Sequence, residues 1–248
     1  MTANTPTSTS KRDRVHALMQ RAQQDITQAF AELDGQATFR PHTWQRAEGG
    51  GGTAMVLEDG AVFDKAGVNV SAVYGKQVPP SLAKQHPQSA TGLSMVIHTK
   101  NPYAPAFHAN YRYFEVGDGT SDSNIWWFGG GADLTPNYAF EDDIHSFHST
   151  LKSLCDRHTT ADYNTFKTTC DDYFYLKHRR EMRGIGGIFI DELSAVGDGD
   201  WAQDLAFVED GLNTIVPSYL PLVARHKAAA YGERERQFQL YRRGRYVE

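Results

Sequence analysis

Cysteine is scarce in this 248-residue chain, and its scarcity excludes two kinds of architecture. Cys155 and Cys170 are the only two cysteines, so neither a disulfide framework nor a four-thiolate metal site is possible. Their spacing matches no redox motif. We therefore expect reduced, buried thiols in a reducing, cytoplasmic compartment.

Long hydrophobic runs are also absent. No apolar segment approaches the ~20 residues of a membrane span, so a membrane-spanning protein is not expected. The first ten residues, MTANTPTSTS, are polar and lack the apolar centre of a secretory signal. They predict a disordered tail over residues 1–10, followed by one domain over residues 11–248.

Positive charge is not in excess. The chain has 25 Lys and Arg against 30 Asp and Glu, a net charge of −5, which argues against a general nucleic-acid binder. The segment from Pro221 onward is different, with seven Lys/Arg against three acids. Such a surface can recruit an anionic ligand, but more often it is a solvated face or contacts an acidic partner.

Aromatic residues are plentiful, with 12 Tyr, 13 Phe and 4 Trp. They fit a protein that encloses a flat, ring-shaped ligand, although a large aromatic core explains them as well.

Hydrophobic periodicity changes along the chain. Apolar residues at helical spacing predict a helix over residues 11–33, which Asp34-Gly35 ends. Short apolar or alternating runs then predict consecutive antiparallel strands, for example in TGLSMVIHT, HANYRYFEV and NIWWFGGG. The later half of the sequence predicts a helix from an N-cap at Thr135-Pro136 to about residue 157, and a second helix over roughly 163–182. A strand follows in RGIGGIFIDEL, and then a helix over 201–231 that is interrupted by Pro217 and Pro221. The last segment, FQLYRRGRYVE, predicts a hairpin that turns at Arg243-Gly244. Strands first and helices later indicate a single α+β domain, an antiparallel sheet covered by helices.

Two glycine-rich segments have both structural and functional interpretations. EGGGGT, from Glu48 to Thr53, matches no phosphate-binding motif and is either a flexible hairpin loop or a place of close backbone approach to a ligand. In WWFGGGADLTP, the glycines would let a planar ligand lie against the backbone, with Asp133 at the edge of the site. Trp126, Trp127 and Phe128 are candidates for an apolar floor, although strand alternation sends one of them to the other face of the sheet. The alternative is that Asp133 caps a helix.

Histidines gather around the segment HTKNPYAPAFHANYRYF. His108, Asn110 and Arg112 fall on one face of a predicted strand, where an imidazole can transfer protons and a guanidinium can bind a carboxylate. Four histidines from different segments could converge on a divalent metal: His98, His108, His148 and His178. Their spacing is not diagnostic, and each alone is more often a surface or hydrogen-bonded core residue.

Six blocks in this order give the sequence a specific resemblance: GGGGT, AGVNVSAVYG, HTKNPYAPAFHANYRYF, WWFGGGADLTP, DDYFYLKHRREMRGIGGIFID and AYGERERQFQLYRRGRYVE. Over residues 44–248 the chain resembles oxygen-dependent coproporphyrinogen III oxidases. The resemblance implies a large, flat antiparallel sheet sandwiched between helices, and a homodimer. It also implies oxidative decarboxylation of two propionates of coproporphyrinogen III to vinyls, giving protoporphyrinogen IX in haem biosynthesis, with O2 as the oxidant.

The resemblance also assigns roles to particular residues. Ser94, Asn110, Tyr111 and Arg112 match substrate-contacting positions, and His108 matches a proposed proton donor. Asp133 matches an acid proposed to hold the pyrrole N–H groups, which with His108 and Arg112 makes a catalytic set. The four histidines, His98, His108, His148 and His178, match positions assigned to a divalent metal.

No organic cofactor is implied, and members of the family continue for about fifty residues beyond RRGRYVE. Two rival functions stay open, a metal-dependent hydrolase that uses the histidines and a non-catalytic tetrapyrrole carrier.

Overall fold

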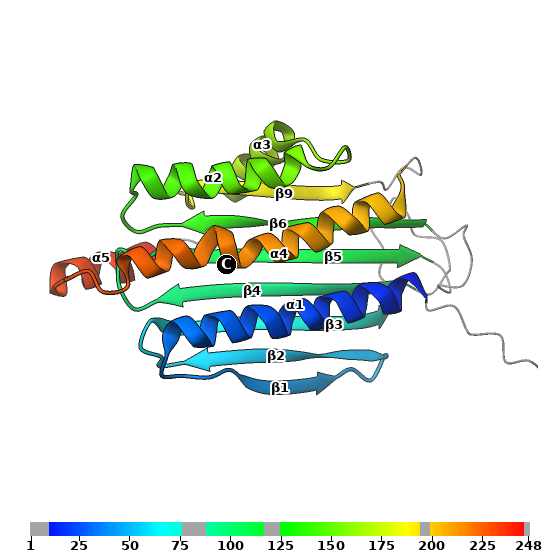
Figure 1. The fold of residues 1–248 in the computed structure, drawn as a ribbon, viewed down its shortest axis with the longest axis horizontal. Helices are drawn as coiled ribbons and strands as arrows, with labels where there is room; N and C mark the ends of the chain where they lie inside the picture. Colours follow the sequence, from blue (N-terminus) through cyan, green and yellow to red (C-terminus); the bar gives the residue numbers. More distant parts are fainter. Residues whose placement is uncertain (1–9, 76–87, 117–124, 194–198, 246–248) are drawn as a thin grey trace, which may run out of the picture.

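A computed structural model describes residues 10–75, 88–116, 125–193 and 199–245. Its centre is a seven-stranded sheet in the order β1-β2-β3-β4-β5-β6-β9, antiparallel throughout (Figure 1). The strands are β1 (Arg40–Gln45), β2 (Gly50–Glu58), β3 (Phe63–Gly75), β4 (Gln88–Thr99), β5 (Ala106–Val116), β6 (Ile125–Thr135) and β9 (Gly186–Leu193). The predicted α+β class and its large antiparallel sheet are confirmed.

Helices lie across one face of this sheet (Figure 1). The long helices α1 (Lys11–Asp34) and α4 (Trp201–His226) contact the central strands, and α2 (Glu141–Asp156) packs against α4. The shorter α3 (Tyr163–Phe174) packs along β9. In the described ranges, no helix is both long and apolar enough to cross a bilayer.

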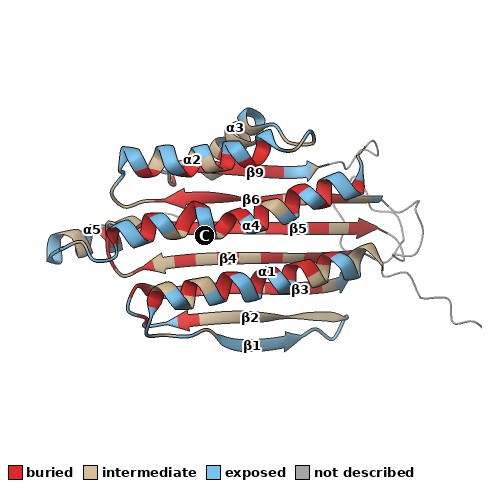
Figure 2. Ribbon diagram, in the orientation of Figure 1, coloured by how far each residue is buried: buried red, intermediate tan, exposed pale blue. Residues whose placement is uncertain are grey.

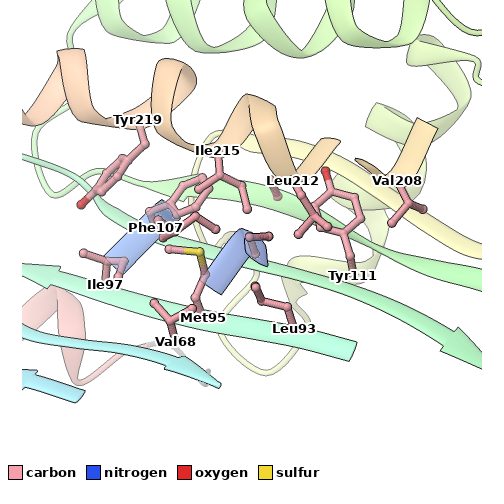
Figure 3. Close-up of a cluster of buried hydrophobic side chains, with 14 of the residues drawn as sticks. Val68, Leu93, Met95, Ile97, Phe107, Tyr111, Val208, Leu212, Ile215 and Tyr219 are labelled. Atoms are coloured by element: carbon pink, nitrogen blue, oxygen red, sulfur yellow. The ribbon is translucent and has the colours of Figure 1, made fainter. Parts of the chain in front are cut away.

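Strand alternation divides the sheet into two chemically different faces. Leu93, Met95 and Ile97 of β4 are almost completely buried, and so are Phe107 and Tyr111 of β5. These residues pack under α4, whose Val208, Leu212, Ile215 and Tyr219 point toward them (Figure 3). The residues between them point to the opposite face, where the polar side chains are.

Burial is greatest in the middle of the sheet and lowest at one edge. Figure 2 shows β1 exposed along its length, whereas β5 and β6 are mostly buried. The first helix is fixed to this framework by Asp34, which accepts hydrogen bonds from the backbone N–H groups of Ala61, Val62 and Phe63 at 2.9–3.0 Å. Burial alone would raise the pKa of Asp34, but these bonds and one from Ala37 lower it to about 2.

Several predicted boundaries were wrong. The segment predicted as a C-terminal hairpin is the helix α5 (Glu233–Arg243), with acids in its first turn and arginines in its last, as the helix dipole favours. Residue 244 follows this helix, and residues 246–248 lie outside the described part. The helix predicted after Thr135 begins only at Glu141, because β6 continues to Thr135 to pair with β5 and β9.

Two further helices differ from prediction. The helix over 163–182 ends at Phe174 and is followed by a small hairpin of β7 (Tyr175–Leu176) and β8 (Glu181–Met182). In contrast, α4 is continuous through Pro217 and Pro221. Burial of the surrounding side chains offsets the lost backbone hydrogen bonds, which local propensity does not reveal. The tail predicted over residues 1–10 lies outside the described residues except for Ser10, which caps α1.

Candidate active site

A cavity of about 780 Å³ opens on the sheet face opposite to α1 and α4. Residues of β4, β5, β6 and β9 line it, and the end of α3 with β7 forms one wall. A second cavity of about 240 Å³ adjoins it over β3 and β4 and shares Ser94, Arg112 and Phe114. We call the larger one the main cavity and the smaller one the side cavity.

The main cavity brings together five residues that the sequence singled out, Ser94, His108, Asn110, Arg112 and Asp133. Strand register explains their proximity. Ser94 of β4 is paired with Asn110 of β5, and His108 of β5 is paired with Asp133 of β6. Because alternate residues of β5 share a face, His108, Asn110 and Arg112 follow one another along the same wall.

Asp133 is almost completely buried and is paired with an arginine that the sequence analysis did not single out. Nη2 of Arg183 donates to both carboxylate oxygens of Asp133, at 2.7 and 2.6 Å, and both side chains are 5% exposed. Nδ1 of His108 lies 3.6 Å from Oδ2 of Asp133. The guanidinium of Arg183 also stacks 3.6 Å from the ring centroid of Phe174. The site therefore contains a buried ion pair beside an imidazole.

Arg112 is in a different situation. Its side chain is exposed to the cavity and makes no hydrogen bond or ion pair with any described residue. Beneath it lies Gly92, where an added Cβ would come 3.0 Å from Cγ of Arg112 and 2.7 Å from the carbonyl oxygen of Tyr111. The missing side chain at Gly92 thus leaves room for Arg112 where the two cavities meet. An uncompensated guanidinium at this place is suited to a carboxylate ligand.

Tyr111 does not reach the cavity. Its side chain is 1% exposed and lies on the helix-covered face under α4, where an added Cβ at Gly211 would come 2.6 Å from its hydroxyl. This burial raises the pKa of Tyr111. Strand alternation sends the Tyr111 side chain to the face opposite Asn110 and Arg112, so the substrate contact predicted at this position stays a prediction that only its backbone could fulfil.

The glycines of WWFGGGADLTP act mainly on the backbone. Gly130 and Gly131 have φ of 143° and 154°, and an added Cβ would come 2.1 Å from the carbonyl oxygen of Asn110 and 2.0 Å from that of Ile188. They let β6 lie between β5 and β9 without a clash. An added Cβ at Gly129 would make only an ordinary contact, 3.4 Å from the carbonyl oxygen of Ile190, and Gly129 lines the main cavity.

The aromatic residues before these glycines divide between the two faces. Phe128 is fully buried in the helix-covered core. Trp127 stacks on Phe114, with ring centroids 5.1 Å apart and an interplanar angle of 16°. Phe114 lines both cavities. The predicted aromatic floor is thus formed by Phe114 resting on Trp127, and not by the three consecutive aromatic residues.

The four histidines predicted as metal ligands are not assembled as one set. Across the ranges that the structure describes, no three His, Cys, Asp or Glu side chains form a group suited to a metal ion. His98 lies on β4 and His178 in the exposed turn after β7. Both ring nitrogens of His148 are engaged, by the carbonyl oxygen of Ile185 at 3.1 Å and the hydroxyl of Tyr163 at 2.9 Å. Burial lowers the pKa of His148.

Comparison with known proteins agrees with the sequence resemblance. The profile of the family described as coproporphyrinogen III oxidase matches residues 14–248. The chain belongs to this family. It is 43% identical over 268 residues to an oxygen-dependent coproporphyrinogen-III oxidase of Synechococcus sp. (strain CC9902), covering 97% of this chain and 72% of that protein. A protein of the same name from Coxiella burnetii (strain Dugway 5J108-111) is 46% identical over 232 residues, covering 91% and 74%.

Membership in the coproporphyrinogen III oxidase family gives the cavity a chemical context. Arg183 is the member of this site that sequence reasoning missed, although the block DDYFYLKHRREMRGIGGIFID was part of the resemblance. Nothing in that block distinguishes Arg183 from its neighbours Arg179 and Arg180. Only the folded chain brings it to Asp133, fifty positions earlier in the sequence.

Proposed function

We propose that this protein is an oxygen-dependent coproporphyrinogen III oxidase. It oxidatively decarboxylates two propionates of coproporphyrinogen III to vinyls and yields protoporphyrinogen IX in haem biosynthesis. The observation that carries this proposal is a single cavity on the open face of the sheet that holds both the buried Asp133–Arg183 pair and the Arg112 guanidinium, which has no ion pair with a described residue. The names of the family and of its relatives support the same reaction.

Arg112 is the residue that we assign to binding a propionate carboxylate. Its guanidinium can donate two parallel hydrogen bonds to the carboxylate oxygens, which fixes the position of the side chain that reacts. Ser94 and Asn110, which are paired across β4 and β5, add neutral donors and acceptors on the same wall. Phe114 provides an apolar surface for the tetrapyrrole.

Asp133 is assigned to the pyrrole nitrogens. Both of its oxygens already accept from Arg183, yet a carboxylate has about four lone-pair directions and can accept further bonds from pyrrole N–H groups. Arg183 holds the carboxylate in a fixed orientation before substrate binds. A fixed negative charge at this place stabilises positive charge that develops in the ring during oxidation.

The stoichiometry of each step requires a proton. Loss of CO2 and of one β-hydrogen from an ionised propionate releases two electrons and one proton, whereas reduction of O2 to H2O2 takes up two electrons and two protons. One proton is therefore consumed for each vinyl group formed. His108 lines the cavity and is assigned to supplying it near neutral pH, with Asp133 orienting its ring.

We assign the oxidant role to O2, which attacks the electron-rich pyrrole; the resulting peroxide removes the propionate β-hydrogen as CO2 leaves. No organic cofactor enters this scheme. A divalent metal held by the four histidines has no support in the described geometry, in which His148 is fully engaged elsewhere. No step is therefore assigned to a metal.

A cytoplasmic homodimer completes the proposal. The edge strand β1 exposes all six of its residues, and an exposed strand edge is suited to pairing with a second copy. Both cysteines are free and buried, and burial raises the pKa of the Cys155 thiol to about 11, as expected for inert thiols in a reducing compartment.

The test mixes the purified protein with coproporphyrinogen III without O2, then admits O2, and follows tetrapyrroles by chromatography together with CO2 and H2O2. We expect vinyl-bearing product only after O2 is admitted, with one CO2 and one H2O2 for each vinyl. A parallel sample with a chelator should react at the same rate. Binding of the tetrapyrrole without O2 consumption would replace the oxidase with a carrier, and a rate that falls on chelation and recovers with added metal would restore the metal hypothesis.

A further inference from the structure

The turn between β7 and β8 is the most basic exposed segment near the cavity. It consists of Lys177, His178, Arg179 and Arg180, all of them exposed. None of these four side chains has a hydrogen bond or ion pair with a described residue. Arg180 has φ of 54°, a backbone conformation that non-glycine residues adopt rarely. We call these four residues the basic turn.

The basic turn is attached directly to the wall of the main cavity. Tyr175 and Leu176, which precede it, line the cavity, and Arg183, three residues after it, is paired with Asp133. The hairpin is also fixed from outside, because Arg245 donates to both oxygens of Glu181 at 2.9 and 3.0 Å. The cationic side chains are therefore held at the margin of the cavity and not on a free loop.

The acids around the basic turn offset only part of its charge. Glu181, Asp171 and Asp133 are each paired with a neighbouring arginine or lysine, whereas Asp172, exposed on α3, has no ion pair with a described residue. Asp191 lines the cavity on β9, four residues beyond Gly187, which is paired with Asp133; this separates Asp191 from Asp133 by ~13 Å along the strand. The end of the cavity next to the basic turn thus carries the excess of positive charge.

We propose that the basic turn is an electrostatic rim that attracts the tetra-anionic substrate and holds the di-anionic product less strongly. This inference rests on the proposed function. The substrate carries four propionates, and the two decarboxylations leave a product with two. Because the attraction of a fixed charge cluster scales with ligand charge, the rim favours binding of substrate over product without touching the reacting atoms.

The test removes two cations from the turn by K177Q/R179Q and leaves Arg180 unchanged because of its backbone conformation. A matched control, R21Q/K152Q, removes two exposed cations from α1 and α2, on the helix-covered side of the sheet. We expect K177Q/R179Q to lower kcat/KM about tenfold at low ionic strength, with kcat unchanged. The difference from wild type should shrink as salt rises above ~0.1 M, where charges more than ~10 Å apart are screened.

Equilibrium binding provides the second measurement, with a tetracarboxylate and a dicarboxylate porphyrin titrated against the protein by fluorescence. K177Q/R179Q should weaken binding of the tetracarboxylate more than that of the dicarboxylate, and R21Q/K152Q should change neither. Equal losses for the two porphyrins, or a K177Q/R179Q protein that matches the control in kcat/KM and salt dependence, would overturn the rim. Wild-type protein without turnover would instead refute the proposed function, and the two porphyrin titrations would still decide on the rim.

Discussion

The buried ion pair of Asp133 and Arg183 makes a strong prediction about stability and turnover together. In Arg183→Met, Asp133 keeps a position that is 5% exposed but loses the guanidinium that donates to both of its oxygens. A buried charge that loses its partner costs about 3–5 kcal/mol of folding free energy. Asp133→Asn should cost a similar amount, because it removes the negative charge with which the buried guanidinium of Arg183 is paired.

The double variant D133N/R183M distinguishes the net contribution of the ion pair to stability from the cost of leaving one of its charges without the other. It removes both charges and should regain most of the lost stability, to within about 1–2 kcal/mol of wild type. Urea unfolding followed by tryptophan fluorescence measures all four proteins of this cycle. Turnover of coproporphyrinogen III should be absent from both single variants and from the double variant, because recovered stability does not restore the carboxylate.

Lys167→Met is the control for this cycle. It breaks an ion pair of similar length, 2.6 Å to Asp171, whose side chains are 32% and 35% exposed. An exposed pair is worth less than about 1 kcal/mol, so this variant should be nearly as stable as wild type. Strictly additive losses in D133N/R183M would show that the two charges do not depend on each other, and substantial turnover in the double variant would remove the pair from the chemistry.

Four more predictions follow from single positions. Arg112→Lys keeps the charge but loses the two-pronged donor, so KM should rise at least tenfold in steady-state assays with little change in stability, and an unchanged KM would exclude Arg112 as an anchor. Asp34→Asn should cost about 2 kcal/mol of unfolding free energy at pH 7, measured by urea unfolding. Because the pKa of Asp34 is about 2 in the folded state and 3.8 in the unfolded state, this stability is present above pH 3.8 and is lost as pH falls toward 2. A difference between the two proteins that stays constant over that pH range would contradict the assignment. Tyr111→Phe should leave KM unchanged and stability equal or slightly higher, because its buried hydroxyl has no hydrogen-bond partner among the described residues; a raised KM would return Tyr111 to the substrate site. Gly130→Ala should cost well over 1 kcal/mol, whereas Gly67→Ala, with open space beside it, should be nearly neutral, and equal losses would refute the steric account of the β6 glycines.

Local patterns predicted the central strands well. Alternation in β5 assigned His108, Asn110 and Arg112 to one face, and the main cavity contains all three. The same pattern assigned Tyr111 to the other face, where it lies. The family resemblance nevertheless added Tyr111 to the substrate contacts. Strand geometry allows only the backbone of Tyr111, and not its side chain, to make such a contact.

Other elements depend on contacts that no local pattern contains. The predicted strand in NIWWFGGG stopped at Gly131, whereas β6 continues to Thr135, although glycines are unfavourable in a strand by propensity. They are strand residues because two neighbouring backbones approach closely on both sides. The C-terminal helix was the reverse case, since Glu233 in its first turn and Arg242 in its last were local signals that favoured a helix over the predicted hairpin.

The two arginines of the cavity show why burial decides what an arginine does. Arg183 is 5% exposed and its Nη2 is paired with Asp133, so its charge contributes mainly to the folded structure. Arg112 is exposed and has no ion pair with a described residue, so a propionate can bind it at little cost in desolvation. Loss of Arg112 should therefore appear in substrate affinity, and loss of Arg183 in stability and turnover. Both arginines lie on the sheet face that α1 and α4 leave open to ligands, and the difference in their burial separates the two effects.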